Sequence, residues 1–574
     1  MLPSSADHIR STIEEQQRLL ESLNCSLQTP SPAATAADSN TPLDDGTIHS
    51  VATSRQTGRN RLRRHDKRMS KQLIDAAEIG DLNGMEHCIQ KNADLNYQSK
   101  KDPPDRNGMA AIHMAAVNGH LSAVEILVSR GANVNLIEPL HQNTALHLAA
   151  TGGYSDLVRY LVRSRANINV RDSLGQTPLL TATSEAIQII LLEAGADPNR
   201  RGLDAATALH YAAYFGFLDA VRLLVSQGAD VDARNKEEQT PLWVACSNTH
   251  IPEEKSVAIA KILLQSSASP NAVSKVGGRT PFDEAICQNR PKVVRLLLEK
   301  GADILARPPD NLYPLHRVAR DGFELVLKEL VPYYESINFR EPDTNYTALH
   351  FATLGGHESC VKFLLTKNAG LQSAGKDGFA PLHHAFRLSS TQISEIIIKE
   401  HISRNISIGL LDTISKRLPI HMASTAEIVE LWVRYKGMVN WRDTNNQPIL
   451  HHAVCHSNHA VVNALIKYGA NLKLTDGHQN TAIEALCFEE TVWETALEER
   501  LAVLQVLLKH VPLTEKCRMA ISQWKNKQIR DRLSKQLPWR SLADVGALTS
   551  SFAMDNRVVL LAGAAVAGVL GARR

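Results

Sequence analysis

The densest cluster of side chains that could bind a metal ion or transfer a proton lies between residues 451 and 459. It contains His451, His452, Cys455, His456 and His459. On a helix, His451, Cys455 and His459 would share one face, and imidazole and thiolate are ligands that zinc prefers. A turn near Ser457-Asn458 would end that helix before the third ligand, however. We therefore expect no metal and no cofactor here, and a structural role for these histidines.

A second candidate is Gly370-Leu-Gln-Ser-Ala-Gly375-Lys376, which has most of the Gly-x4-Gly-Lys pattern of phosphate-binding loops. Asp377 follows where a Ser or Thr would hold Mg2+, and its charge would repel phosphate. We predict a turn instead. Because we find no hydrolase or metalloprotease motif in a suitable context, the sequence favours a protein that is not an enzyme.

Histidine also recurs in a short motif about every 33 residues. Close copies of the motif are Thr144-Ala-Leu-His147-Leu-Ala-Ala150, Thr207-Ala-Leu-His210-Tyr-Ala-Ala213 and Thr347-Ala-Leu-His350-Phe-Ala352. Thirteen units can be registered on this position, which is occupied by Ile74, His113, His147, Leu180, His210, Trp243, Asp283, His316, His350, His383, His421, His451 and Glu484.

The residue types in the motif indicate a pair of short helices. Thr suits the cap of the first helix. Pro fits the next position, as in Thr240-Pro241, because the backbone N–H that Pro lacks would have no partner at the start of a helix. Apolar runs such as Ala220 to Val225 form the core stripe of a second helix, and Gly228 suits the turn after it. One such unit cannot bury its apolar face alone, so the units must stack.

The period and the Thr-Pro-Leu-His-like start resemble the ankyrin-repeat family over residues 70–512. This resemblance implies an all-α solenoid of about 13 helix–turn–helix units with hairpin tips. It also implies that the recurrent histidine hydrogen-bonds to neighbouring turns, and that the tips and first helices bind partner proteins. We expect a non-enzymatic scaffold or adaptor.

The chain is divided by composition into five segments. We predict a disordered region with a short helix and a basic run (1–68), the repeat solenoid (69–512), a helical C-cap (513–540), a linker (541–556) and a candidate membrane anchor (557–574). The eight cysteines show no paired spacing and no apolar signal region is found, so we expect an intracellular protein.

Positive charge is concentrated just before the repeats. The basic segment comprises Arg59, Arg61, Arg63, Arg64, Lys67 and Arg68. It fits a nuclear-import signal, a contact with nucleic acid or another anionic surface, or a solvated linker. Asn60 and Arg68 have the Asn-x7-Arg spacing of a basic-zipper helix, and in this the segment resembles fungal regulators that join a basic region to ankyrin repeats. The alternative function is therefore a nuclear transcription regulator, although Arg63 and Arg64 replace the expected alanine pair.

The predicted hairpin tips also carry many cations. The candidate protein-binding residues are Arg171, Arg200, Arg201, Arg234, Lys236, Lys275, Arg279, Arg307, Arg340 and Arg442. Acidic residues are interleaved with them. The tips are thus either simply polar or a mildly basic surface for an acidic protein partner.

An apolar stretch lies between Arg557 and Arg573. Its larger side chains are Val558, Leu560, Leu561, Val566, Val569 and Leu570. As a helix it would span about 22 Å, short of the roughly 30 Å hydrocarbon core. It resembles the tail anchors of mitochondrial outer-membrane and peroxisomal proteins. We expect it to hold the repeats on the cytosolic face of such a membrane; the alternative location is the nucleus.

Overall fold

The computed structural model describes residues 67–98, 108–275, 277–306, 312–488 and 497–522. The basic segment before Lys67, the linker 541–556, the candidate anchor 557–574 and most of the predicted C-cap lie outside the described residues. Contacts divide the chain into two compact units, residues 1–314 and 315–574, and each is described by itself.

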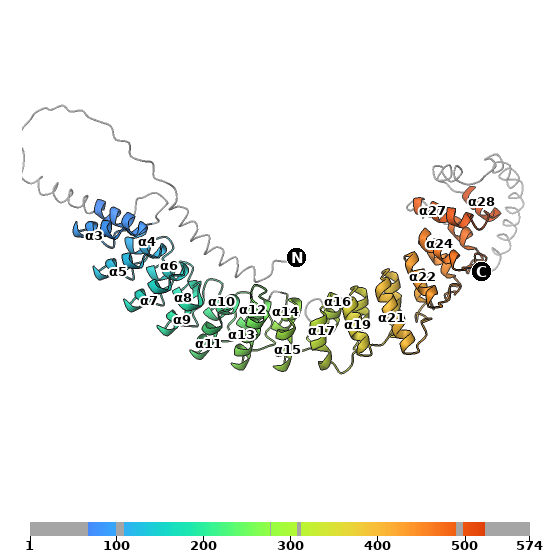
Figure 1. Ribbon diagram of the computed structural model, residues 1–574, viewed down its shortest axis with the longest axis horizontal. Helices are drawn as coiled ribbons and strands as arrows, with labels where there is room; N and C mark the ends of the chain where they lie inside the picture. The colour runs from blue at the N-terminus through green and yellow to red at the C-terminus, as the bar shows by residue number, and fades with distance from the viewer. Residues whose placement is uncertain (1–66, 99–107, 276, 307–311, 489–496, 523–574) are drawn as a thin grey trace, which may run out of the picture. The chain divides into compact units, whose positions relative to one another are not determined.

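The first unit is built from pairs of short antiparallel helices (Figure 1). A helix over residues 67–79 precedes α3 (Leu82–Gln90). The pairs that follow are α4 (Ala111–Val117) with α5 (Leu121–Ser129), α6 (Ala145–Thr151) with α7 (Ser155–Arg163), α8 (Pro178–Thr181) with α9 (Glu185–Glu193), α10 (Ala208–Phe215) with α11 (Leu218–Ser226), α12 (Pro241–Ser247) with α13 (Glu253–Gln265), and α14 (Pro281–Cys287) with α15 (Pro291–Glu299).

The second unit repeats the same arrangement. Its pairs are α16 (Pro314–Asp321) with α17 (Glu324–Leu330), α18 (Ala348–Leu354) with α19 (Glu358–Thr366), α20 (Pro381–Arg387) with α21 (Thr391–Ser403), η2 (Pro419–Met422) with α22 (Ala426–Arg434), α23 (Ile449–Cys455) with α24 (His459–Lys467), and α25 (Ala482–Phe488) with α27 (Leu497–Leu508). The short 3-10 turn η1 (Val331–Tyr333) follows α17, and α28 (Glu515–Ser522) packs on α25. The described residues thus hold thirteen helix pairs, which confirms the predicted repeat number.

Within each unit the helices form two layers. First helices pack on first helices, from α4 to α14 in one unit and from α18 to α25 in the other. Second helices pack on second helices in the same order. The core lies between the layers, where Leu146 of α6 and Leu161 of α7 are fully buried. Small residues such as Ala149 let the first helices approach closely.

Two units have a shortened first helix. Helix α8 has only four residues. At the divergent unit near residue 420 the first helix is the 3-10 helix η2, also of four residues. The described residues contain no strand, only the isolated bridges Arg442–Pro448 and Thr475–Thr481, so the all-α prediction is confirmed.

None of the described helices is both long enough and apolar enough to cross a membrane. That finding does not reach the candidate anchor, because residues 557–574 lie outside the part that the structure describes.

Candidate functional site

Two hairpin turns of the first unit are held in shape by a polar side chain at their first residue. In the first unit, Asp172 Oδ1 accepts from the amides of Leu174 (2.9 Å) and Gln176 (2.8 Å). Asn235 Oδ1 accepts in the same way from Glu237 (3.0 Å) and Gln239 (2.9 Å). Because these bonds satisfy the turn amides locally, the turns are preformed and not left to be ordered by a ligand.

Neighbouring turns are also joined to one another. The amide of Ser173 donates to the carbonyl of His141 (2.8 Å), and the amide of Lys275 donates to the carbonyl of Glu237 (2.9 Å). The amide of Lys236 makes the equivalent bond to Asp204 (2.8 Å). The turns of the first unit therefore form a row whose spacing is fixed by the backbone.

The recurrent histidine connects each helix pair to the next turn. His210 Nδ1 accepts from the amide of Thr207 (3.1 Å), while its Nε2–H donates to the carbonyl of Gln239 (3.0 Å) in the following repeat. His147 bonds in the same way to Thr144 and to the carbonyl of Gln176. This is the role that the family resemblance implies.

In some repeats the position of the recurrent histidine holds another residue, and there a carboxylate can make the cap. Asp283 Oδ2 accepts from the amide (3.0 Å) and hydroxyl (2.8 Å) of Thr280, and Glu484 bonds likewise to Thr481. This position therefore needs a side chain that accepts the hydrogen bonds of the cap, and it does not need an acid–base group.

Burial makes these histidines unsuited to proton transfer near neutral pH. It lowers the pKa of His113, His147 and His210 to about 4. Burial, followed by the nearby His384, lowers the pKa of His350 to about 3. A neutral imidazole with both nitrogens engaged is a structural element and not a general base.

Several predicted tip cations are used to join successive repeats. The side chain just before a turn donates to the carbonyl at the same position in the next repeat. This holds for Arg201 to Arg234 O (3.4 Å), Arg234 to Val273 O (3.1 Å), Arg340 to Ala374 O (2.9 Å) and Arg442 to Thr475 O (2.6 Å). These arginines contribute to the stack, so only part of their charge is available to a partner.

Some tip cations also form ion pairs within the first unit. These are Arg200 with Asp197 (2.9 Å), Arg201 with Asp230 (4.0 Å), Lys275 with Glu238 (3.0 Å) and Arg279 with Glu284 (3.4 Å). Arg171 and Lys236 are exposed, and no ion pair of either is found among the described residues. Arg307 lies outside them, whereas Lys67 and Arg68 of the basic segment are described and exposed. Arg171 and Lys236 are therefore the tip cations best placed to attract a partner.

Exposed apolar side chains also lie in or just before the turns of the first unit. Leu140 is 53% exposed and Leu203 58% exposed, and both are in turns. Ile137 (46%) and Val273 (49%) stand just before turns. We call Ile137, Leu140, Arg171, Leu203, Lys236 and Val273 the tip surface. Its apolar members were not predicted from the sequence; leucine in turns that usually carry polar residues was the available signal.

The histidine cluster at 451–459 does not converge in the second unit. His451 Nε2 donates to the carbonyl of Asn480 (2.9 Å), and His456 Nδ1 donates to that of His452 (2.8 Å). His459 starts the next helix, α24. No group of three or more His, Cys, Asp or Glu side chains among the described residues could hold a metal ion.

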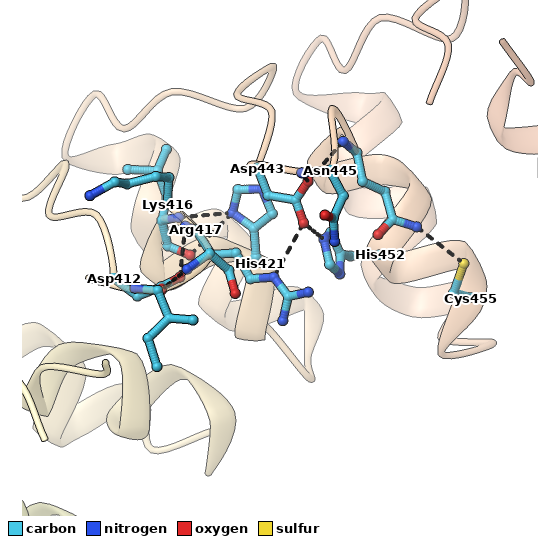
Figure 2. A network of polar contacts seen from close by, with 12 residues as sticks. Asp412, Lys416, Arg417, His421, Asp443, Asn445, His452 and Cys455 are labelled. Atoms are coloured by element: carbon cyan, nitrogen blue, oxygen red, sulfur yellow. Dashed lines mark hydrogen bonds and ion pairs between the residues drawn. The ribbon is translucent and has the colours of Figure 1, made fainter. Parts of the chain in front are cut away.

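His452 belongs to a different network, drawn in Figure 2, which centres on Asp443. Asp443 Oδ2 accepts from His452 Nε2 (3.1 Å) and from Arg417 Nε (3.3 Å). Its Oδ1 accepts from the amides of Asn445 and Gln447 (2.9 Å each). Asp443 and His452 are both buried, so this network joins two turns and does not face solvent.

The Gly370–Lys376 stretch forms a turn between repeats. The amide of Gly375 donates to Phe379 O (3.0 Å) and that of Lys376 to Thr344 O (2.8 Å). Asp377 Oδ1 accepts from the amide of Phe379 (3.1 Å). These bonds use the backbone donors that a phosphate would need, in agreement with the predicted turn.

Comparison with known families identifies the repeat. The profile described as "Ankyrin repeats (3 copies)" matches overlapping segments from residue 73 to 308 and residues 315–408. A profile described as "Ankyrin repeat" matches residues 445–477. Together these matches span more than half of the chain.

Three related proteins match parts of the chain. The "Putative palmitoyltransferase ZDHHC13" of Danio rerio is 30% identical over 235 residues, 40% of this chain and 30% of that protein. The "SH3 and multiple ankyrin repeat domains protein 2" of Homo sapiens is 25% identical over 38% of this chain and 11% of its own length. The human "Transient receptor potential cation channel subfamily A member 1" is 27% identical over 56% of this chain and 28% of its own length. The chain thus spans less than a third of each.

Among solved structures, the ankyrin repeat domain of Bcl-3 aligns with a TM-score of 0.34 and 22% identity. The alignment covers 40% of this chain and 99% of that domain.

Proposed function

The chain belongs to the ankyrin-repeat family, and on that premise we propose that it is a non-enzymatic scaffold whose tip surface binds a partner protein. Repeats of this family generally mediate contacts between proteins. The observation that carries the proposal is the group of exposed apolar side chains on a preformed row of turns. Leu140 and Leu203 are each more than half exposed, although their turns already hold fixed positions.

The energetics favour binding at such a surface. Covering the exposed part of each leucine with a partner's apolar side chain would contribute about 1 kcal/mol. The turns make their backbone hydrogen bonds before binding, so little ordering cost opposes this gain. A few apolar anchors of this kind can supply most of the affinity of an interface.

The charge of the tip surface indicates which kind of partner it would bind. Arg171 and Lys236 lie on the tip surface, and neither forms an ion pair with the acidic residues of the turns among the described residues. We therefore propose a partner segment with apolar side chains and a net negative charge. The two cations would raise its association rate more than its final affinity.

The test replaces Leu140→Asp and Leu203→Asp together in the full chain. We expect the double variant to lose at least about tenfold in affinity for a partner purified with the native chain, because two apolar contacts are lost and an acidic partner is repelled. The measurement is titration of that partner against each chain by calorimetry.

The matched control is Leu325→Asp. Leu325 in α17 of the second unit is 58% exposed, the same fraction as Leu203, but it is outside the tip surface. Unchanged affinity of the tip variant, or an equal loss in the Leu325→Asp control, would exclude the tip surface as the binding site.

We further propose that residues 557–574 tether the scaffold to a membrane, with the repeats facing the cytosol. The proposal rests on the apolar sequence between Arg557 and Arg573 alone. Carbonate extraction of cell membranes should leave the full chain in the pellet and release a version that stops at Asn556. Equal release of the two versions would contradict the tether, and accumulation of the full chain in the nucleus would favour the basic segment as the targeting element.

A further inference from the structure

Two buried cysteines lie against each other at the end of the second unit. Cys487 is in α25 and Cys517 is in the first turn of α28, and these two helices pack together. Both side chains are fully buried. The two thiols lie close enough across this helix pair to share a hydrogen bond.

The surroundings of the two sulfur atoms differ. The Thr514 hydroxyl, at the cap of α28, donates to Cys517 Sγ (3.2 Å). The hydrogen bond from Cys487, together with that from Thr514, holds the pKa of Cys517 below its usual value despite burial. The same contact raises the pKa of Cys487. Cys517 is thus the thiol of the pair that loses its proton more readily, and Cys487 lies beside it to resolve its oxidised form.

Three other cysteines among the described residues have different surroundings. Burial raises the pKa of Cys88, of Cys246 to about 12 and of Cys360 to about 11. Their thiols remain protonated near neutral pH and react slowly with oxidants.

We propose that Cys487 and Cys517 form a redox modification site, in which a peroxide converts the pair to a disulfide that fixes α28 on the last repeat. This goes beyond the proposed scaffold function and does not depend on the tip surface.

The reaction balances with hydrogen peroxide as the oxidant. The Cys517 thiolate attacks one peroxide oxygen; an S–O bond forms, the O–O bond breaks, and the released hydroxide takes a proton to leave as water. The Cys487 sulfur then attacks the sulfur of this sulfenic acid. An S–S bond forms, the S–O bond breaks, and a second water carries away the oxygen and the Cys487 proton. The pair loses two electrons and the peroxide gains them.

The disulfide would act on helix α28, which caps the stack of repeats. Helix α28 covers α25, and its Ile521 is fully buried there. A terminal repeat has a repeat neighbour on one side only, so a cap is needed to cover its other side. Because both sulfur atoms are buried, peroxide reaches them only when α28 opens locally. The hydrogen bond from Thr514 to Cys517 is made within the α28 segment, so it supports the Cys517 thiolate in that open state as well. Oxidation would then hold the cap closed after the helix returns.

The test exposes the full chain to hydrogen peroxide, blocks the remaining thiols with a maleimide and maps the cysteines by peptide mass spectrometry. We expect a peptide pair linked through Cys487 and Cys517 that dithiothreitol separates. We also expect the amides of α28 to exchange with deuterium about tenfold more slowly after oxidation, because the link opposes local opening.

Two variants make the test specific. Cys487→Ser should leave Cys517 as a sulfenic acid that dimedone traps, whereas Cys360→Ser should leave the linked peptide unchanged. The proposal is overturned if the oxidised native chain lacks the 487–517 link, or if other cysteine pairs are linked in preference. A link that leaves deuterium exchange in α28 unchanged overturns the clamping role.

Discussion

Lowering the pH from 6.5 to 4 should destabilise the repeats far more than any single exposed substitution. The pKa values of His113, His147 and His210 are about 4 in the folded chain, below the usual 6.5. The unfolded chain therefore binds more protons across this window. Stability is fully present above pH 6.5 and is lost as the pH falls toward 4. Each shift corresponds to a free energy of unfolding on the order of 3 kcal/mol at full effect.

The measurement is urea unfolding followed by circular dichroism at several pH values. His210→Gln should keep a donor for the carbonyl of Gln239 while removing the titration, so its stability should fall less steeply between pH 6.5 and 4. His250→Gln is the control, because His250 is exposed. If native chain and His210→Gln show the same pH dependence, the buried histidines do not govern acid unfolding.

Replacing Asp443→Ala should destabilise the second unit by about 3 kcal/mol. The substitution removes the carboxylate that Arg417 and His452 share, and two turn amides also lose their acceptor. A buried donor left without a partner destabilises the fold by more than a typical hydrogen bond stabilises it. Because repeats interact mainly with their neighbours, the effect should be local. Deuterium exchange should rise most at residues 412–417 and 443–447.

Asp443→Asn should cost less, because its amide oxygen can still accept from the turn amides of Asn445 and Gln447. Thr444→Ala, in the same turn, is the control for an exposed substitution and should change stability by less than about 0.5 kcal/mol. Equal stability of the Asp443→Ala and Thr444→Ala chains would show that the network contributes nothing.

The helix pairs could be predicted from the sequence because their signals are local. A cap, a Pro such as Pro241 at the first helical position and an apolar run lie within one repeat. The position of the recurrent histidine also tolerates Asp283 and Glu484, since any acceptor three residues after the Thr can complete the cap. Registered over thirteen units, these short signals determine the fold.

The candidate site could be predicted only in part, because several of the predicted tip cations interact between repeats. Arg234 and Arg340 are exposed, as expected, but each donates to a carbonyl of the next repeat. Within a single repeat, nothing distinguishes Arg234 and Arg340 from Arg171. The residues that could bind such an arginine lie about 30 residues away, in the next repeat. The contacts of Asp443 with Arg417 and the pairing of Cys487 with Cys517 depend on stacking in the same way.

The most direct measurement of the central claim is selection of binding peptides by the full chain from a random library displayed on phage. We predict that the enriched peptides combine apolar residues with net negative charge. They should bind the chain carrying Leu140→Asp and Leu203→Asp at least about tenfold more weakly, and should bind the native chain more weakly as salt is raised. Enrichment of neutral or basic peptides, or equal binding to the native and variant chains, would contradict a tip surface that recognises an acidic partner.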